Sequence, residues 1–508
     1  LWAFSAAILP WIAECDADVA ATVRANSDIS VATAPMSDGF VAVKAELEKV
    51  YSCMGITCAQ VGGLLNGDTT NFIEGFEPCT DGGATDGVFA AMAGYSPVSD
   101  VIEHSQLDLD MAEIEEGADA LDEDGFEAAF TRYSEGLNRA SSNPVSFSKH
   151  PPALLRFSAH PLGSEKTDET RTIRAFSTEA QEKLAGEPFF EIWQGFWGAP
   201  DYADAFTSSA CQGTGAFAGA SMATRSEGCL KGAQYQNVWM YVLHELEDAV
   251  GDCNNGDLSA NDGGPHAWDE GWAFYAGSLE GTAVGGSADG GQMVYALAEK
   301  RCENFGTCST AGVSAVNTEL LALWHTGQEH LLAGECDAAG ALIPEMASLM
   351  AVPLIQGVQR YFYLADPQGG AGGDKEASEL WAFSAAILPW IAECDPAVAE
   401  TVRANSDISL ATAPMTDGFV AAKAELEKVY SCMGITCAQV GGLIDEGNIA
   451  GLEACDDGSS LDPDAEAGST ARTAGSNSDD GLSGGGIAGI VIAVGAVTAL
   501  GVVALVLL

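Results

Sequence analysis

The segment KGAQYQNVWMYVLHELEDAV (residues 231–250) shows the pattern that dominates this chain: apolar side chains recur at positions i, i+3 and i+4. That spacing places them on one face of an α-helix. The same periodicity returns along the chain, at residues 101–117, 126–138, 178–197, 267–279, 293–305, 317–333, 344–363, 380–394 and 418–433. Alternating patterns typical of strands are scarce. The sequence therefore predicts an all-α fold of packed helices.

The charge balance excludes one class of function. The 508 residues include 73 Asp and Glu but only 21 Lys and Arg, which gives a formal net charge of −52. No nucleic-acid binder is expected, because no basic surface is available to neutralise phosphates. With 47% hydrophobic residues the chain can bury a large core, so the acids are expected on the surface of a folded protein. They indicate either solubility in a salty medium or an affinity for cations.

Fourteen cysteines indicate a disulfide-rich fold. The sequence contains no CxxC pair, so neither a zinc ribbon nor a thioredoxin-type redox motif is supported. Short spacings, such as Cys53 to Cys58 and Cys302 to Cys308, suit disulfide loops instead. Disulfides persist in oxidising compartments, and we expect the protein to lie outside the cytosol.

A long internal repeat sets the predicted domains. Residues 1–64 return as residues 380–443, and only six of these 64 positions differ. We expect residues 1–82 to be the C-terminal part of a truncated preceding repeat, and residues 83–460 to be a complete helical unit. The cysteine counts of the two parts, four and ten, are both even and support this division.

The end of the chain is predicted to anchor the protein. Residues 461–486 are rich in Gly, Ser and Asp and read as a flexible linker. Residues 487–508 carry no charge and are long enough to span a bilayer. Small residues at 476–478, a polar spacer and the apolar tail also match a GPI-attachment signal. A transmembrane segment or a GPI anchor would each tether the chain at the outer face of the membrane.

The histidines supply candidate metal ligands. Four of the seven carry a carboxylate four residues later, which on a helix lies on the same face. The segments HELED (244–248) and HAWDE (266–270) add a second carboxylate at the third position, among aromatic residues that indicate burial. Such helices, facing inward, make a mixed nitrogen and oxygen site that suits iron or manganese. The predicted ligands are Glu103, His104, His244, Glu247, Asp248, His266, Asp269 and Glu270.

Several alternatives stay open for these motifs. Histidine and carboxylate at this spacing also form ordinary helix-surface ion pairs, which is the favoured interpretation for His325 and Glu329. HELED is similar to the HExxH helix of zinc proteases, but Asp248 stands where the second histidine is needed, so a metallohydrolase is the weaker alternative. The dipeptide Lys300–Arg301 could hold an anion beside the metal or pair with acids. A structural or adhesive acidic surface protein without metal is the competing class.

Three segments resemble a known family: VLHELEDAVGDC (242–253), GPHAWDEGWAFYAGSLEG (264–281) and YALAEKRCENFGTC (295–308). They resemble the algal iron-assimilation proteins, which are low-iron-inducible (also high-CO2-inducible) periplasmic proteins of green algae related to phytotransferrin domains. The resemblance implies a periplasmic or cell-surface protein that captures ferric iron without known catalysis. Its partners could include a synergistic anion and a membrane iron transporter or reductase. We therefore predict an iron-binding protein that assists iron uptake and is not an enzyme.

Overall fold

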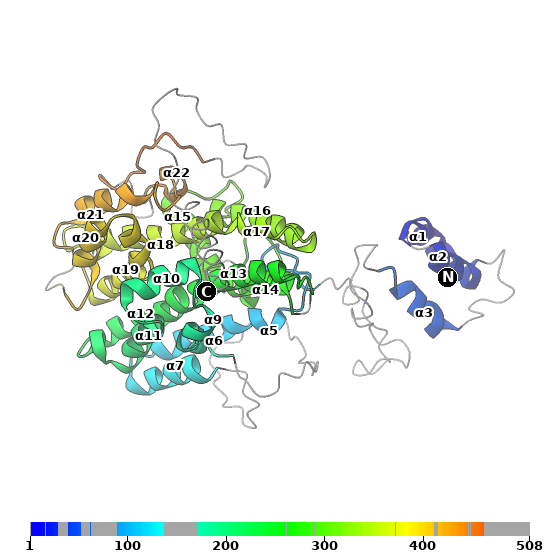
Figure 1. The fold of residues 1–508 in the computed structure, drawn as a ribbon, viewed down its shortest axis with the longest axis horizontal. Helices are drawn as coiled ribbons and strands as arrows, with labels where there is room; N and C mark the ends of the chain where they lie inside the picture. Colours follow the sequence, from blue (N-terminus) through cyan, green and yellow to red (C-terminus); the bar gives the residue numbers. More distant parts are fainter. Residues whose placement is uncertain are drawn as a thin grey trace, which may run out of the picture. The chain divides into compact units, whose positions relative to one another are not determined.

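The computed structural model describes residues 2–15, 17–28, 39–51, 61, 89–136 and 171–461, the last range without residues 261, 288–289, 371, 411–414, 445–446 and 448. The described residues confirm the all-α prediction. They contain helices and two isolated bridges, Met92 with Tyr95 and Cys308 with Ser314, but no β-strand (Figure 1). The predicted anchor and the predicted linker after residue 461 lie outside the described residues.

The main body consists of residues 89–136 and 171–461. Its first helices are α5 (Ile102–Ser105), α6 (Leu107–Asp119), α7 (Glu123–Glu135), α8 (Ala175–Thr178), α9 (Ala180–Lys183), α10 (Pro188–Trp197), α11 (Tyr202–Gln212), η1 (Gly215–Phe217), α12 (Met222–Gly232), the π-helix η2 (Ala233–Val238) and α13 (Trp239–Asn255). The others are α14 (Gly264–Ala276), η3 (Ser278–Glu280), α15 (Val294–Phe305), α16 (Ala315–Leu332), α17 (Cys336–Gly340), α18 (Ile343–Ala365), α19 (Asp374–Cys394), α20 (Pro396–Ser406), α21 (Phe419–Leu426), η4 (Glu427–Val429) and α22 (Cys437–Val440).

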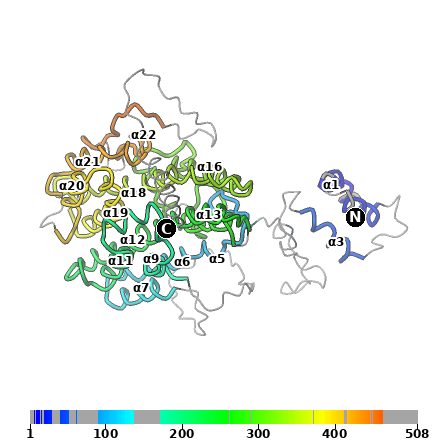
Figure 2. The backbone as a smooth tube through the Cα atoms, viewed as in Figure 1, coloured from blue at the N-terminus to red at the C-terminus, as the bar shows by residue number. Residues whose placement is uncertain are grey.

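Two long apolar helices, α18 and α19, lie side by side in the main body (Figures 1 and 2). Every residue of α18 from 346 to 359 is buried. Two tryptophans tie neighbouring helices to this pair, because the indole N–H of Trp193 donates to the carbonyl of Ala386 at 2.9 Å and that of Trp239 to the carbonyl of Met350 at 3.2 Å. Burial of these side chains and satisfaction of their N–H groups fix α10 and α13 against the core.

One described stretch, Cys336–Ala365, is long and apolar enough to cross a membrane. Its most apolar window is 67% buried inside the fold, as is usual for the core helix of a folded domain. Its apolar character is therefore accounted for by the packing of α18.

The predicted helix at 178–197 is wrong, because the chain there forms α8, α9 and α10 instead. Gly186 adopts a φ of +93°, which breaks the helical path, and Pro188 starts α10 at its first turn. The predicted helix at 231–250 is one continuous path but contains the π-helix η2, which apolar periodicity does not predict.

The N-terminal residues form α1 (Trp2–Cys15), α2 (Ala17–Ser27) and α3 (Phe40–Glu48), with an apolar cluster of their own that includes Ile12, Val23 and Val43. When the two copies of the repeat are aligned, the first and last residues of α2 correspond to the first and last residues of α20. The two copies of the repeated sequence therefore form the same local helices. The assignment of residues 1–82 to a truncated unit stays a prediction.

Disulfides confirm the disulfide-rich prediction. Five bonds join described cysteines: Cys211–Cys229, Cys253–Cys336, Cys302–Cys308, Cys394–Cys432 and Cys437–Cys455. The short Cys302–Cys308 loop is as predicted. Cys432 and Cys437 are the equivalents of Cys53 and Cys58 in the second copy of the repeat. They do not bond to each other, because Cys432 bonds to Cys394 and Cys437 to Cys455, so the predicted short loop is wrong for that copy. Cys53 and Cys58 themselves lie outside the described residues.

Candidate metal centre

The candidate site lies where α5 and α13 meet α14. The start of α14 approaches α13 closely at a glycine, since a Cβ on Gly264 would lie 2.5 Å from the carbonyl oxygen of Ala249. A larger residue would push the two helices apart, so glycine at this position brings His266, two residues further, against α13. Aromatic side chains line the same region: the ring of His104 lies 5.8 Å from that of Phe274.

Three predicted ligands converge here, and we call them the His–Glu cluster: His104 of α5 with His266 and Glu270 of α14. Nε2 of His104 lies 2.7 Å from Oε1 of Glu270, and Nε2 of His266 lies 2.9 Å from the same oxygen. Candidate ligand atoms of the three residues all lie within 4.8 Å of one another. Their side chains are 12–18% exposed, so an ion from solvent can reach them.

These separations fit a metal ion with little movement. Nitrogen and oxygen ligands of a small divalent or trivalent ion lie about 2.0–2.2 Å from it, so neighbouring donors of an octahedral site lie about 3 Å apart. The two measured separations, 2.7 and 2.9 Å, are close to that value. Two imidazoles and a carboxylate form the mixed donor set that suits iron.

The other ring nitrogen of each histidine is free within the described part of the chain: Nδ1 of His104 and Nδ1 of His266 are buried without a hydrogen-bond partner there. Metal-binding histidines usually donate this second N–H to a carboxylate or a carbonyl. Here ring packing holds them instead, because the two imidazoles meet edge to face with centroids 5.6 Å apart.

Glu245 of α13, which the histidine spacing does not predict, completes the acidic side of the site. Its side chain is buried and hydrogen-bonded to Glu270. Burial and then the charge of Glu270 raise the pKa of Glu245 well above its usual value. Burial also acts to raise the pKa of Glu270, but the neighbouring His104, His266 and Arg171 outweigh it and lower that pKa.

Arg171 is the cation nearest to the cluster among the contacts of the described residues. Its Nη2 lies 2.6 Å from Nε2 of His104, and its guanidinium lies over the ring of Phe274, 5.7 Å from the centroid. Burial lowers the pKa of His104 against the opposing effect of Glu270, and the positive charge of Arg171 acts in the same direction as burial. His104 is therefore neutral near pH 7 and has a lone pair to offer.

The other predicted ligands of α13 lie outside the His–Glu cluster. Nδ1 of His244 lies 2.6 Å from Oε1 of Glu187, the residue before α10. Burial and the charge of Glu187 raise the pKa of Glu247 to about 8. Asp248 is exposed. His244 thus contacts Glu187, and the charges of Glu247 and Asp248 interact with it, so the structure does not bring the eight predicted residues together in one cluster.

Asp269 lies outside the His–Glu cluster. It is fully buried, and its two oxygens accept hydrogen bonds from the hydroxyl of Tyr95, the amide of Gln328, the backbone N–H groups of Val98 and Ser99, and the hydroxyl of Ser99. A carboxylate so fully used holds the segment before α5 onto α14 and has no lone pair left for a metal. Glu103 is exposed on α5 and is not one of the described residues whose candidate ligand atoms converge in the cluster.

The basic dipeptide Lys300–Arg301 contacts other protein groups. Nη1 of Arg301 donates to Oδ1 of Asn304 at 2.8 Å, and its guanidinium lies over the rings of Tyr361 and Phe383. The charge of Lys300 acts on Glu280, which agrees with pairing to an acid, and an anion beside the dipeptide stays a prediction.

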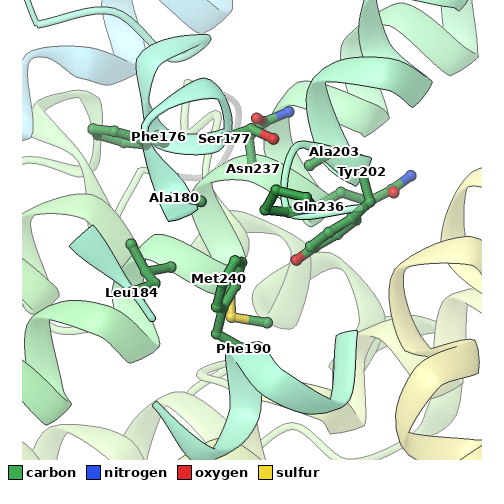
Figure 3. Close-up of a pocket in the computed structure, with 11 residues that line it drawn as sticks. Phe176, Ser177, Ala180, Leu184, Phe190, Tyr202, Ala203, Gln236, Asn237 and Met240 are labelled. Atoms are coloured by element: carbon green, nitrogen blue, oxygen red, sulfur yellow. The ribbon is translucent and has the colours of Figure 1, made fainter. Parts of the chain in front are cut away.

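A small cavity lies between α8, α10, α11 and the π-helix η2 (Figure 3). Its volume is about 10 Å³, enough for about one water molecule and too small for an organic ligand. The hydroxyl of Tyr202 and the amide nitrogen of Gln236, both on residues that line it, are buried without a partner in the described part of the protein. One water could satisfy such groups, so the cavity is structural and separate from the metal centre.

Comparison with known proteins places these features in one family. A family model described as "low iron-inducible periplasmic protein" matches residues 79–460, which include every residue of the His–Glu cluster, Glu245 and Arg171. No curated protein and no solved structure matches the chain.

Proposed function

Because the chain belongs to the low iron-inducible periplasmic protein family, we propose that it binds ferric iron outside the plasma membrane and assists iron uptake. The proposed ligands are His104, His266 and Glu270, with Glu245 as a fourth donor. Glu245 is included because its hydrogen bond to Glu270 places its carboxyl beside the cluster. The name of the family indicates a periplasmic location and a link to iron.

One observation carries the proposal: the convergence of two imidazole nitrogens on a single carboxylate oxygen, at 2.7 and 2.9 Å, from two separate helices. Carboxylates offer hard oxygen and negative charge to Fe(III), and imidazoles select against calcium. The His–Glu cluster is also the one group of this kind among the described residues whose ligand atoms come together.

The surroundings of the protein belong to the same proposal. Residues 487–508 would tether it to the outer face of the membrane, because these 22 residues carry no charge. Iron held there would pass to a membrane transporter or reductase. Binding and transfer of the ion need no bond to be made or broken in a substrate, so no catalytic step is proposed.

The proposal is tested by titrating the purified chain with ferric nitrilotriacetate and measuring bound iron by elemental analysis. We expect a His104→Ala/His266→Ala variant, and separately Glu270→Gln, to lose affinity by about 100-fold or more, since each removes direct ligands. His330→Ala is the matched control, because His330 pairs with Glu335 on the surface and should leave binding unchanged.

His244→Ala separates the structural site from the wider set predicted by sequence. His244 contacts Glu187, so we expect the variant to bind iron as the wild type does. Equal iron binding by the wild type and the His104→Ala/His266→Ala variant would refute the assigned ligands. A chain that holds no stoichiometric iron would support the structural or adhesive alternative.

A further inference from the structure

Two neighbours of His104 contact the same atom, Nε2, and require opposite hydrogen-bonding roles from it: one needs an acceptor and the other a donor. Nε2 lies 2.6 Å from Nη2 of Arg171 and 2.7 Å from Oε1 of Glu270. A guanidinium can only donate hydrogen bonds, so Nε2 accepts from Arg171 and carries no proton. It therefore cannot donate to Glu270 at the same time, and the proton of the neutral ring sits on Nδ1.

Two lone pairs then face each other across 2.7 Å, one on Nε2 of His104 and one on Oε1 of Glu270. Two lone pairs at this distance repel each other unless a cation lies close enough to attract both atoms. Without a metal Arg171 is that cation, because its guanidinium donates to Nε2 of His104. The ring of Phe274 holds the guanidinium in place by a cation–π contact at 5.7 Å.

We propose that Arg171 is a built-in counter-ion of the metal-free His–Glu cluster and competes with iron for the lone pair of His104. The inference rests on the proposed iron-binding function and adds a means of controlling it. When iron binds, Nε2 bonds to the metal, and the guanidinium has to withdraw because two cations would otherwise lie only a few ångströms apart. When iron leaves, Arg171 returns and restores the charge balance of the buried carboxylates.

Two opposite effects follow for the wild-type protein. Arg171 stabilises the metal-free cluster, because its positive charge lies beside His104 and the largely buried carboxyl groups of Glu270 and Glu245. The same residue weakens iron binding, because iron must displace it. A centre of this kind binds reversibly, which suits a protein that passes its ion on.

The test compares the full chain with Arg171→Gln, Arg171→Lys and the control Arg132→Gln, which removes an equal charge from the surface pair of Arg132 with Glu113. Affinity is measured by titration with ferric nitrilotriacetate, and the stability of the iron-free protein by thermal unfolding. We expect Arg171→Gln to bind iron roughly 10- to 100-fold more tightly and to melt at a lower temperature without iron. Arg171→Lys keeps the charge and should bind within a few-fold of the wild type, as should Arg132→Gln.

Chemical rescue gives a readout that a merely structural arginine would not move. In Arg171→Ala, millimolar methylguanidinium should raise the melting temperature of the iron-free protein and weaken its iron binding, with no such effect on the wild type. If the wild type binds iron but Arg171→Gln binds it equally or more weakly, the inference is overturned and the proposed function stands. If neither protein binds iron, the proposed function itself is overturned.

Discussion

Two neighbouring carboxylates of α14 show how far single residues can be predicted from the sequence. Asp269 and Glu270 both follow His266 at helical spacing, so the spacing rule treats them alike. The structure separates them, because Asp269 turns to the segment before α5 and Glu270 turns to His104. The rule identifies a helix face but cannot say which segment covers it, and that information exists only in the packed fold.

Glu245 shows the opposite failure, because the spacing rule omits a residue that belongs to the site. Its partner Glu270 lies on another helix, so no spacing within α13 identifies it. A usable signal exists nevertheless. Residues 238–246 are apolar around almost the whole helix, which predicts burial on all sides. An acid within such a helix needs a partner, which points to a functional or structural cluster.

A substitution at Asp269 should affect stability and leave metal binding intact. In Asp269→Ala the hydroxyl of Tyr95 and the backbone N–H groups of Val98 and Ser99 lose their acceptor inside the core. We expect the free energy of unfolding, measured in urea, to fall by roughly 3 kcal/mol, with iron affinity unchanged. Glu270→Gln is the matched neighbour and should show the reverse pattern. If the Asp269→Ala protein is fully folded under the assay conditions and still fails to bind iron, the purely structural role given to Asp269 is contradicted.

Glu280 should make the stability of the fold depend on pH. Burial, and then the charges of Glu299 and Asp108, raise its pKa to about 7, against the opposing effects of the N–H of Ser287 and the charge of Lys300. Because the folded pKa lies above the unfolded one, the stabilisation is complete below about pH 4.5 and is lost as pH rises through about 7.

The measurement is thermal unfolding of the wild type and Glu280→Gln at pH 5 and pH 8. Between pH 5 and pH 8 the free energy of unfolding of the wild type should fall by on the order of 2 kcal/mol more than that of the variant, because only the wild type gains a buried charge. Other buried carboxyls, such as Glu247, titrate in both proteins and cancel in the comparison. Equal pH dependence in the two proteins would show that Glu280 is ionised throughout.

At the scale of elements, apolar periodicity predicts long helices well. The predictions at 293–305 and 317–333 agree with α15 and α16 within two residues at each end. The prediction at 178–197 fails where Gly186 and Pro188 outweigh the apolar pattern. The π-helix η2 could not be predicted from apolar periodicity, because one inserted residue shifts the register of a helix without changing its composition.

The repeat offers a matched pair of substitutions within almost identical helices. Trp390 of α19 is 4% exposed and packs against Phe189 and Trp193 of α10, whereas its equivalent in α1, Trp11, is 50% exposed. We expect Trp390→Ala to lower the free energy of unfolding by about 3–5 kcal/mol. Trp11→Ala should change it by less than about 0.5 kcal/mol. Equal effects in urea denaturation would show that neighbouring helices also cover Trp11.

At the scale of the whole molecule, the fold class and the disulfide content follow from the sequence, but the pairing of cysteines does not. Ten cysteines in one unit allow many pairings, and spacing favours the short loops only. The structure resolves the choice for the second repeat copy by placing α19 beside the segment that follows α21, so that Cys394 meets Cys432. Such pairings depend on which helices are neighbours.

The first repeat copy should have the disulfide pairing of the second. Cys15 is disulfide-bonded, and the repeat relates the four N-terminal cysteines to Cys394, Cys432, Cys437 and Cys455. We therefore expect the bonds Cys15–Cys53 and Cys58–Cys79. Proteolysis of the unreduced protein followed by mass spectrometry of linked peptides checks both. Recovery of a peptide with a Cys53–Cys58 bond would contradict the prediction.

The assembly of the metal centre from α5, α13 and α14 has a consequence for how much iron one chain can carry. All seven histidines lie between residues 104 and 330, and neither copy of the repeat, 1–64 or 380–443, contains one. Doubling that sequence lengthens the protein but supplies no second pair of imidazoles. For the proposed site we therefore expect one iron ion per chain at the His–Glu cluster, and we expect this stoichiometry not to rise with the number of repeat copies.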